Sequence, residues 1–478
     1  MPAFFKHYIN GRWETGVTVG TSSNPSDLSD VVGEFARADA NQTLQAIRAA
    51  SEAGDAWANS TSQRRFDVLD FVGNELLARK DELGQLLARE EGKSLPEAVG
   101  EAARAGQIFR YFAAEALRLR GDKLASVRPG VEIDVTREPI GVVGVIAPWN
   151  SPLAIPAWKI APALAYGNAV VFKPAELVSG CGWALTEIIS RSGLPAGVFN
   201  LVMGSGRLVG QTLVDSPLVN GISFTGSAAT GNSVLNAVTA RGGKVRVEMG
   251  GKNPLVVLAD ADLDRAVECA VQGAFFSTGQ RCTASSRLIV EAPAYDKFVS
   301  RLRGRTQALV TDHALKRGTD MGPVVSAEQL ATDLQYIEIG QTEGAQLLCG
   351  GERLVREAQG HYLSPALFLA EPQHRIAREE IFGPVAAILR ADDYAHALSL
   401  ANDTPYGLCS GICTTSLRHA THFRRYAQAG MVMVNLPTAG VDFHVPFGGR
   451  KGSSHGSREQ GTHAAEFYTT GKTAYVLA

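Results

Sequence analysis

The chain has 478 residues, of which 45% are hydrophobic and 20% are charged, with a formal net charge of -2. This length exceeds one ordinary core and predicts two or three domains, and the composition is that of a folded globular protein. Lysines and arginines are scattered among the acids, so no basic field is expected to hold nucleic acid or an anionic membrane.

The cysteine pattern and the apolar runs indicate which sites and which cellular location to expect. Six cysteines without a CxxC pair do not form a disulfide framework. Cys409 and Cys413 are four residues apart, but no His or Cys pair follows at zinc-binding spacing, so no metal site is predicted. The first residues lack the apolar run of a signal peptide, and no stretch of about 18 apolar residues predicts a membrane span. A reducing cytoplasm is the expected location.

The N-terminal quarter is predicted to be mostly helical. After a short strand-like stretch, HYINGRW, residues from about Asn41 to Ala116 place apolar side chains at i, i+3, i+4 and i+7, which is helical spacing. Asp81 and Glu82 fall on the expected exposed face of one of these helices. Further on, VEIDVTREP alternates like a strand, and Pro139 ends it.

The following segments alternate strands with helices. Four short β-branched runs, each followed by a helical stretch, predict a parallel sheet covered by helices: GVVGVIAPWN, AVVFKPAE, GVFNLVMG and GISFTGS. A nucleotide would bind at the carboxyl ends of such strands. A second series predicts a second α/β domain: NPLVVLADAD, SSRLIVEAP, AQLLCGG, LSPALFLA, FGPVAAILR and GMVMVN. The β-rich tail, HAAEFYTTGKTAYVLA, is expected to pair with the Val131 strand or with another subunit.

One cysteine stands out by its surroundings. Cys282 lies in FFSTGQRCTASSR, directly after Arg281 and among small polar residues. The thiolate is the reactive form of cysteine, and a cation or backbone N–H groups lower the thiol pKa. Small neighbours such as Gly279 and Thr283 let a substrate approach closely. Two interpretations stay open: a nucleophile, or a small buried hydrophobic residue, which is the commoner role of a free cysteine.

Two polar residues stand where strands and helices meet loops, a common place for catalytic groups. Glu248 ends an alternating strand just before Gly250 and Gly251, and its carboxylate is a candidate general base for water. Asn150 precedes a Ser-Pro helix start, and its amide is a candidate oxyanion donor. The alternatives are an exposed glutamate at a strand end and an ordinary helix cap.

Two further stretches are candidates for binding a nucleotide. VVFKPAE ends a strand with Lys173 and Glu176, which can hydrogen-bond ribose hydroxyls; Glu176 would repel a 2′-phosphate, which favours NAD over NADP. In SFTGSAATG, Gly226 and Ser227 begin a helix whose N-terminus suits a pyrophosphate. The standard GxGxxG fingerprint is missing, because MGSGRLVG has the wrong spacing and is interpreted as a turn.

Together these pieces resemble the aldehyde dehydrogenase family. In chain order the motifs are APWNSP, KPAE, FTGS, EMGGKNP and GQRC, followed by EEIFGPV, NDTPYGL and PFGGRKGS. Each motif is weak alone, but their joint order and spacing are specific and cover nearly the whole chain. The small departure is Met249, where the family usually has leucine. The resemblance also explains the missing fingerprint, because the family binds NAD without it.

The resemblance implies the α/β fold of the aldehyde dehydrogenases. We expect a Rossmann-like NAD-binding domain at residues 1–121 and 142–248, a catalytic α/β domain at 249–441, and oligomerisation strands at 122–141 and 460–478 that form a small β flap. It also implies NAD as the cofactor, with NADP possible, no metal, and a homodimer or a homotetramer.

The resemblance assigns the chemistry residue by residue. Cys282 would attack the aldehyde to give a thiohemiacetal, whose oxyanion the Asn150 amide and the Cys282 backbone N–H would hold. After hydride transfer to the nicotinamide, Glu248 would activate water to hydrolyse the thioester. Glu459 matches an acid of the family's proton path. Sulfur addition comes first because a bare aldehyde could lose hydride only by forming an acylium ion.

The same resemblance places the cofactor contacts. The two nucleotide-binding stretches described above would meet the adenosine ribose and the pyrophosphate. Trp149 would line the same groove, Glu380 would hold the nicotinamide ribose, and Phe382 would lie against the ring.

The substrate is implied more loosely. Arg281 resembles members that oxidise semialdehydes carrying a carboxylate, because a guanidinium can pair with an acid tail bidentately. GQRCTASSR and PFGGRKGSSHGSREQG look most like members acting on 2-oxoglutarate semialdehyde. Succinate or glutarate semialdehyde, or a broad range of aldehydes, stays open, as does a surface or interface ion pair for Arg281. Ile155, Trp158 and the loop Pro437–His444 with Phe443 are expected to line the tunnel.

Two functions of other kinds also stay open. A catalytically silent binding or structural protein on the same fold would be expected to lose the nucleophile or the base, yet Cys282, Glu248 and Asn150 are all present. An acylating enzyme that passes the thioester to coenzyme A would be expected to lack the glutamate.

Overall fold

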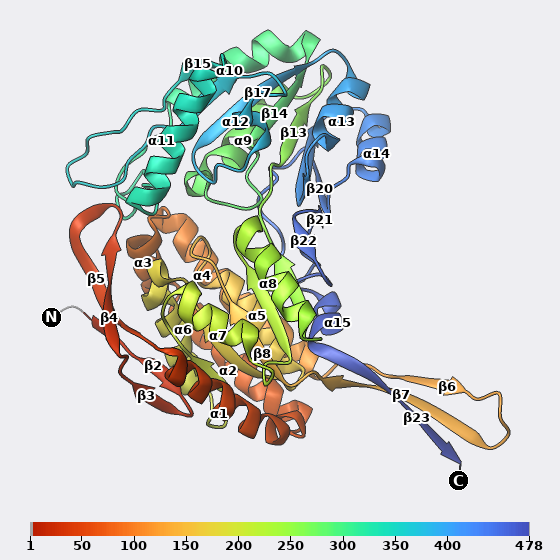
Figure 1. Ribbon diagram of the computed structural model, residues 1–478. Helices are drawn as coiled ribbons and strands as arrows, with labels where there is room; N and C mark the ends of the chain where they lie inside the picture. Colours follow the sequence, from red (N-terminus) through yellow and green to blue (C-terminus); the bar gives the residue numbers. More distant parts are fainter. Residues whose placement is uncertain (1–2, 478) are drawn as a thin grey trace.

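The computed structural model describes residues 3–477 and has two α/β lobes and a projecting β arm (Figure 1). The first lobe is built on an eight-stranded sheet. Its strands, in spatial order, are β22 (Ser454–His455), β12 (Lys244–Glu248), β11 (Gly221–Thr225), β8 (Val142–Ile146), β9 (Ala169–Lys173), β10 (Phe199–Leu201), β2 (His7–Ile9) and β3 (Arg12–Glu14). From β12 to β10 the strands are parallel, which confirms the first predicted sheet.

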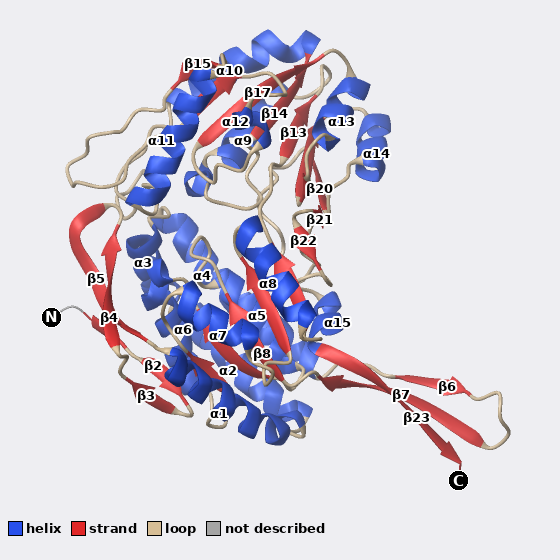
Figure 2. Ribbon diagram, viewed as in Figure 1, coloured by secondary structure: helices blue, strands red, loops and turns tan. Residues whose placement is uncertain are grey.

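Helices cover both faces of this sheet (Figure 2). They are α1 (Ala40–Ala58), α2 (Ser62–Ala78), α3 (Lys80–Glu91), α4 (Leu95–Ala116), α5 (Ala154–Ala165), α6 (Ser179–Ser190), α7 (Gln211–Asp215) and α8 (Ala228–Ala240). Along β8, Val143 and Val145 pack into the core shared with α2 to α6, whereas Val142 and Ile146 pack into the core shared with α1, α7 and α8. Successive strand residues point to opposite faces, so a strand buried on both faces must be apolar throughout.

The second lobe is built on a seven-stranded sheet. In spatial order it contains β15 (Gln346–Cys349), β16 (Ala366–Leu369), β17 (Val385–Ala391), β14 (Arg287–Glu291), β13 (Pro254–Val257), β19 (Cys409–Cys413) and β20 (Met431–Val434). Only β15 runs antiparallel to its neighbour. Its helices are α9 (Leu263–Ala274), α10 (Tyr295–Gln307), α11 (Ala327–Thr342), α12 (Arg375–Arg378), α13 (Tyr394–Asn402) and α14 (Leu417–Tyr426). The strand β19 was not predicted from the sequence, and its Cys409 and Cys413 are buried core residues.

The arm is a three-stranded antiparallel sheet of β6 (Asp122–Ala125), β7 (Val131–Pro139) and β23 (Thr469–Leu477). β23 pairs with β7 from Thr469 opposite Pro139 to Leu477 opposite Val131, which confirms the predicted pairing of the tail. The arm extends away from both lobes (Figure 1), and β23 is exposed along nearly its whole length. A sheet with so little burial needs a further contact to be stable.

The remaining strands connect these parts. β1 (Ala3–Phe5), β5 (Asp27–Arg37) and β4 (Thr18–Asn24) form a separate sheet, and β18 (Tyr406–Gly407) pairs with β21 (Arg450–Lys451). The predicted HYINGRW strand is the β2–β3 hairpin, which turns at Asn10 and Gly11 with φ of 50° and 78°. Gly206–Gly210, interpreted as a turn, is a π-helical turn that leads into α7. Among residues 3–477, no helix is long and apolar enough to cross a membrane.

The return of the chain from the second lobe to the first brings its last residues next to Glu248. After completing the second lobe, the chain returns and β22 adds antiparallel to β12, with Ser454 opposite Glu248. A short helix, α15 (Ala465–Tyr468), then leads into the arm. Residues beyond 441 therefore contact the sheet of the first lobe directly. The domain bounds expected from the sequence remain a prediction.

Candidate active site

Cys282 lies on the loop between α9 and β14. Before it, Ser277 and Thr278 have left-handed backbone with φ of 52° and 57°, a conformation that persists only where surrounding contacts hold it. The side-chain amide of Asn253 donates to the backbone carbonyls of Cys282 at 2.7 Å and Ala284 at 2.9 Å. The Cys282 loop is therefore held to the first residues of the second lobe.

Two cavities meet at Cys282 and Asn150. The first, of about 290 Å³, is lined by residues of α4, α5, the Cys282 loop and the loop after β20, among them Glu97, Glu101, Arg104, Ile155, Trp158, Arg281 and Phe447. The second, of about 200 Å³, is lined by Trp149, Gly226, Ser227, Gly250, Glu380 and Phe382, among others. Cys282 therefore borders two separate cavities.

The pKa of the Cys282 thiol is raised to about 12. Burial is the largest cause, and the negative charges of Glu380 and Glu248 add to it, whereas Arg281 acts in the opposite direction. The sequence analysis considered that a neighbouring cation would lower this pKa, but the burial of the thiol outweighs the cation. The thiol is therefore protonated near neutral pH, and its reaction requires a base.

Asn150 does not cap a helix. It is buried on the loop after β8, α5 begins only at Ala154, and the Asn150 amide donates to the backbone carbonyl of Gln280 at 3.0 Å. An amide NH₂ group has two N–H donors, so one remains available. The amide lines both cavities beside Cys282. This placement suits an oxyanion donor.

Glu248 ends β12 and is only 3% exposed, so the alternative of an exposed strand-end glutamate is wrong. The Ser454 hydroxyl donates to its carboxylate from the neighbouring strand. Burial raises the pKa of Glu248 to about 8, and the negative charge of Glu459 adds to the effect. The Ser454 hydrogen bond and the positive charge of Lys159 lower it. A carboxyl group with this pKa suits a general base.

On the side of the second cavity, Trp149 meets Phe382 edge to face, with ring centroids 5.4 Å apart. Phe382 has a left-handed backbone with φ of 64°, a conformation that is uncommon outside glycine. The Glu380 carboxylate accepts a hydrogen bond from the Gly251 backbone at 2.9 Å. A Cβ atom at Gly250 would overlap that carboxylate, so only glycine leaves room for Glu380 here.

Gly226 and Ser227 lie where β11 passes into α8, as predicted. Ser227 is the N-cap of α8, and its hydroxyl accepts from the Thr230 backbone at 3.4 Å. Both residues line the second cavity. The free N–H groups of a helix N-terminus favour anionic groups.

The family follows from the whole sequence. Residues 14–474 match the aldehyde dehydrogenase family. The chain belongs to this family. It is 44% identical to an alpha-ketoglutaric semialdehyde dehydrogenase of Bacillus subtilis, over 99% of this chain and 98% of that protein. It is 42% identical to an alpha-ketoglutarate semialdehyde dehydrogenase of Haloferax volcanii, over 98% of both.

Solved structures agree with the fold. The crystal structure of betaine aldehyde dehydrogenase from Staphylococcus aureus in complex with NAD+ superimposes with a TM-score of 0.96 at 30% identity, covering 99% of this chain and 95% of that one. This confirms the predicted aldehyde dehydrogenase fold, and its NAD+ agrees with the predicted cofactor. The chain is thus an oxidoreductase that acts on aldehydes.

The structure of this aldehyde dehydrogenase differs from the expected substrate wall at one aromatic residue. Ile155, Trp158 and Arg281 line the first cavity, but Phe443 does not. The Phe443 ring instead meets the Tyr111 ring edge to face, with centroids 6.2 Å apart. Phe447 takes the place on the wall and stacks on Trp158, with centroids 5.0 Å apart.

Lys173 and Glu176 lie outside both cavities, at the carboxyl end of β9. Arg37 Nε pairs with Glu176 Oε1 at 2.6 Å. Lys173 donates to the backbone carbonyl of Pro174 at 3.0 Å, and burial lowers its pKa to about 8. Since Arg37 neutralises part of the Glu176 charge, the repulsion expected against a 2′-phosphate is weaker than the sequence implied.

A buried ion cluster behind Glu248 was not predicted in full. Glu459 pairs with Lys159 and, at 2.7 Å, with Arg246, and all three side chains are fully buried. Lys159 also donates to the Ser223 hydroxyl at 3.0 Å. The only sequence signals were a lysine inside the otherwise uncharged helix AIPAWKIAPALA and an arginine inside a short strand. The charges of the cluster act on the pKa of Glu248 in opposite directions, Glu459 raising it and Lys159 and Arg246 lowering it.

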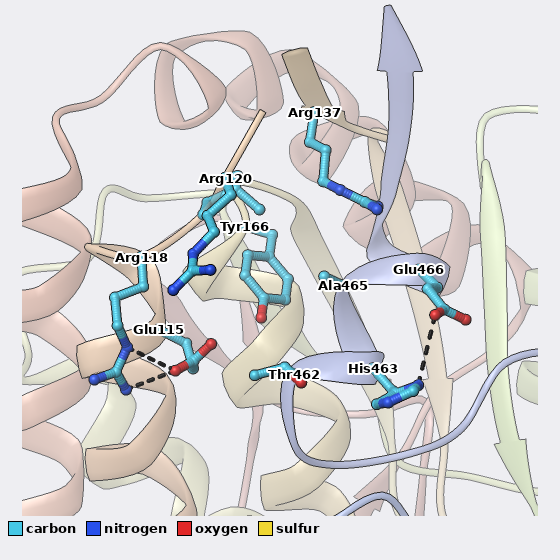
Figure 3. A pocket seen from close by; sticks show the side chains of 10 residues that line it. Glu115, Arg118, Arg120, Arg137, Tyr166, Thr462, His463, Ala465 and Glu466 are labelled. Atoms are coloured by element: carbon cyan, nitrogen blue, oxygen red, sulfur yellow. Dashed lines mark hydrogen bonds and ion pairs between the residues drawn. The ribbon is translucent and has the colours of Figure 1, made fainter. Parts of the chain in front are cut away.

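A separate cavity of about 370 Å³ lies at the base of the arm (Figure 3). Tyr166 projects into it, Arg118 pairs with Glu115 at 2.6 Å, and His463 lies 3.5 Å from Glu466. None of the predicted site residues lines this cavity. It is therefore distinct from the candidate active site.

Proposed function

We propose that this aldehyde dehydrogenase oxidises a semialdehyde that carries a carboxylate, foremost 2-oxoglutarate semialdehyde, to the corresponding acid with NAD as the hydride acceptor. The meeting of the two cavities at Cys282 carries the proposal, because an aldehyde and a nicotinamide must reach the same sulfur from different sides. The names of the Bacillus and Haloferax relatives support the choice of substrate.

The second cavity fits the cofactor. Gly250 leaves room for the Glu380 carboxylate, which is positioned for ribose hydroxyls, and the N-terminus of α8 is positioned for phosphate. Trp149 and Phe382 provide an aromatic wall. When bound, NAD supplies an acceptor for the hydride that leaves the substrate carbon.

In the first step, the Cys282 sulfur adds to the aldehyde carbon. The thiol proton leaves to solvent as the sulfur attacks, so Glu248 keeps its ionised form for the water of the second step. The carbonyl oxygen becomes an alkoxide. The free N–H of Asn150 and the Cys282 backbone N–H stabilise this negative charge. Collapse of the alkoxide breaks the C–H bond with its electron pair and leaves a thioester on Cys282.

In the second step, water hydrolyses the thioester. Glu248 takes a proton from the water as its oxygen attacks, and the C–S bond breaks to release the carboxylic acid and the thiol. Asn150 stabilises the tetrahedral oxyanion again. Glu459 acts as a positioning residue, since its contacts are with Lys159 and Arg246 and its charge acts on Glu248 from a distance.

A steady-state screen tests the proposal. The purified protein is given four- to six-carbon semialdehydes and neutral aldehydes of equal length, each with NAD and with NADP, and NADH or NADPH formation is followed. We expect the acidic semialdehydes to have the higher kcat/KM; a preference for neutral aldehydes contradicts the substrate class. Succinate and glutarate semialdehyde are the competing substrates. Coenzyme A should not change the rate, whereas an acylating enzyme would need it.

We also propose that the protein is a homodimer or homotetramer in the cytoplasm. The exposed β23 strand and its apolar Tyr475, Val476 and Leu477 support an intersubunit contact. The six free cysteines suit a reducing compartment. Light scattering should give a mass of two or four times 50.8 kDa, and a mass of 50.8 kDa contradicts the oligomer.

A further inference from the structure

The first cavity contains an arginine that the sequence analysis did not consider. Arg104 lies on α4 and lines the cavity together with Cys282. Its Nε is buried and has no hydrogen-bond partner among residues 3–477. A buried polar group without a partner is costly, and more so when it is charged. Its position therefore indicates that a ligand supplies the missing acceptor.

The other charged groups of this cavity are bound to the protein itself. Lys93 Nζ donates to Glu101 Oε2 at 2.6 Å and to the Asn150 backbone carbonyl at 2.8 Å. Glu97 accepts from the Ser277 hydroxyl at 2.8 Å. The lysine and both glutamates thus have hydrogen-bond partners within the protein. The remaining charged groups that could bind a ligand are the guanidinium groups of Arg104 and Arg281.

Arg281 also has a buried Nε without a hydrogen-bond partner among residues 3–477, but another of its donors is held by the protein. Its Nη2 donates to the backbone carbonyl of Gln272 on α9, which holds the guanidinium toward that helix. Arg104 instead has its guanidinium carbon 5.8 Å from the centroid of the Trp158 ring. Trp158 in turn stacks on Phe447. Such a cation–π stack orients the planar fork of an arginine while its N–H donors stay free.

A second donor lies in the same wall. Trp158 is 5% exposed, and its indole Nε1 also has no hydrogen-bond partner in the described part of the chain. Indole nitrogen can only donate, and buried tryptophans usually find an acceptor. Two unpaired donors on adjacent side chains, Arg104 and Trp158, match the two oxygens of one carboxylate.

We infer that Arg104, assisted by Trp158 Nε1, binds the carboxylate of the substrate, and that Arg281 does not set the preference for acidic aldehydes. This inference rests on the proposed function. It replaces Arg281 by Arg104 as the residue that pairs with the substrate carboxylate. A semialdehyde would span the cavity with its carbonyl at Cys282 and its acid end at Arg104. A neutral aldehyde would leave both donors unpaired, which disfavours it in the transition state as well as in the ground state.

The test uses the full-length protein with 2-oxoglutarate semialdehyde and pentanal, which have the same number of carbons. The measured quantity is the ratio of kcat/KM for the acid to that for pentanal. We expect Arg104→Met to lower this ratio about 100-fold, as for loss of a charge-assisted hydrogen bond. Arg104→Lys should lower it about tenfold, because a point charge replaces the bidentate fork.

Two matched variants serve as comparisons. Arg281→Met should change the ratio less than about threefold, since one guanidinium donor is already bound to Gln272. Arg110→Met removes an exposed arginine of the same helix and should leave the ratio as in the wild type. If Arg281→Met lowers the ratio and Arg104→Met does not, the assignment is overturned.

The Arg104→Met variant could fail to fold, so a binding measurement compares the wild type with Arg281→Met and the more conservative Arg104→Lys. Glutarate should slow alkylation of Cys282 by iodoacetamide in the wild type and in Arg281→Met, but much less in Arg104→Lys. Equal protection in Arg104→Lys and wild type overturns the inference. A wild type that does not prefer the acid over pentanal overturns the proposed substrate class itself. A wild type that prefers it, with an unchanged ratio in both Arg104 variants, overturns only the role of Arg104.

Discussion

The side-chain amide of Asn150 donates a hydrogen bond to the backbone carbonyl of Gln280 at 3.0 Å. Asn150 belongs to the loop after β8 in the first lobe, and Gln280 lies two residues before Cys282 in the second. The hydrogen bond therefore joins the two lobes next to Cys282, the proposed nucleophile. It also fixes the amide, whose residue lines the same two cavities as Cys282.

Replacing Asn150 by alanine should lower kcat about 10²- to 10³-fold, the usual cost of removing one oxyanion donor. The reason is that the alkoxide on the Cys282 adduct loses a preorganised donor. KM should change far less than kcat. The thermal unfolding midpoint serves as a control for the lost contact with Gln280. A kcat within about threefold of the wild type rules out this role for the amide.

Replacing Glu248 by glutamine should separate the two halves of the reaction. The thioester would form and then persist, so rapid mixing should show a burst of NADH close to one per subunit followed by slow turnover. In the wild type, the base form of Glu248 grows as pH rises, so kcat should increase with pH along a limb centred near its pKa of about 8. A glutamine variant with normal steady-state turnover contradicts the assignment.

Changing a charge in the buried cluster of Lys159, Arg246 and Glu459 should shift the pH at which kcat rises, in a direction set by the sign of that charge. Glu459→Gln removes a negative charge that raises the pKa of Glu248, so the limb should shift to lower pH; Lys159→Met removes a positive charge, so it should shift to higher pH. Each variant breaks a buried ion pair and should also lose about 3–5 kcal/mol of unfolding free energy. Measurements of kcat against pH check the sign. Shifts in the same direction for both variants contradict the electrostatic explanation.

The Arg37–Glu176 ion pair should control the choice between NAD and NADP. Glu176→Ala frees the Arg37 guanidinium for a 2′-phosphate and removes the competing carboxylate. The ratio of kcat/KM for NADP to that for NAD should rise about tenfold. Arg37→Ala is the matched control, because it leaves Glu176 unpaired and should lower the ratio. If neither variant moves the ratio, the pair lies away from the 2′ position.

Local patterns predicted most of the fold. The helical spacing between residues 41 and 116 appears as α1 to α4, and the β-branched runs appear as parallel strands. A helix buried on one face repeats its apolar residues every three or four positions, and a strand buried on both faces is a continuous apolar run, so both patterns can be recognised in the sequence. Pairing of the tail with the Val131 strand was also predicted and is confirmed. The strand β19 was missed because CSGIC has few β-branched residues, and it lies buried between β13 and β20.

Contacts between distant segments could not be predicted in the same way. Lys159 and Glu459 are 300 residues apart and meet only because β22 returns to the first sheet. The sequence placed Arg281 next to the nucleophile, but it could not show that Gln272 accepts its hydrogen bond. Arg104 was overlooked because one arginine on an amphipathic helix looks like a solvated residue until the cavity beside it is known.

The proposed oxidation depends on a covalent bond between the substrate and Cys282. The wild-type protein is mixed with 2-oxoglutarate semialdehyde and NAD, quenched in acid during turnover, digested and analysed by mass spectrometry. We expect the peptide that contains Cys282 to carry the mass of the acyl group, and Cys349, the other cysteine that is not fully buried, to remain unmodified. Continued NADH formation with no adduct on the Cys282 peptide would show that the oxidation does not proceed through this thiol.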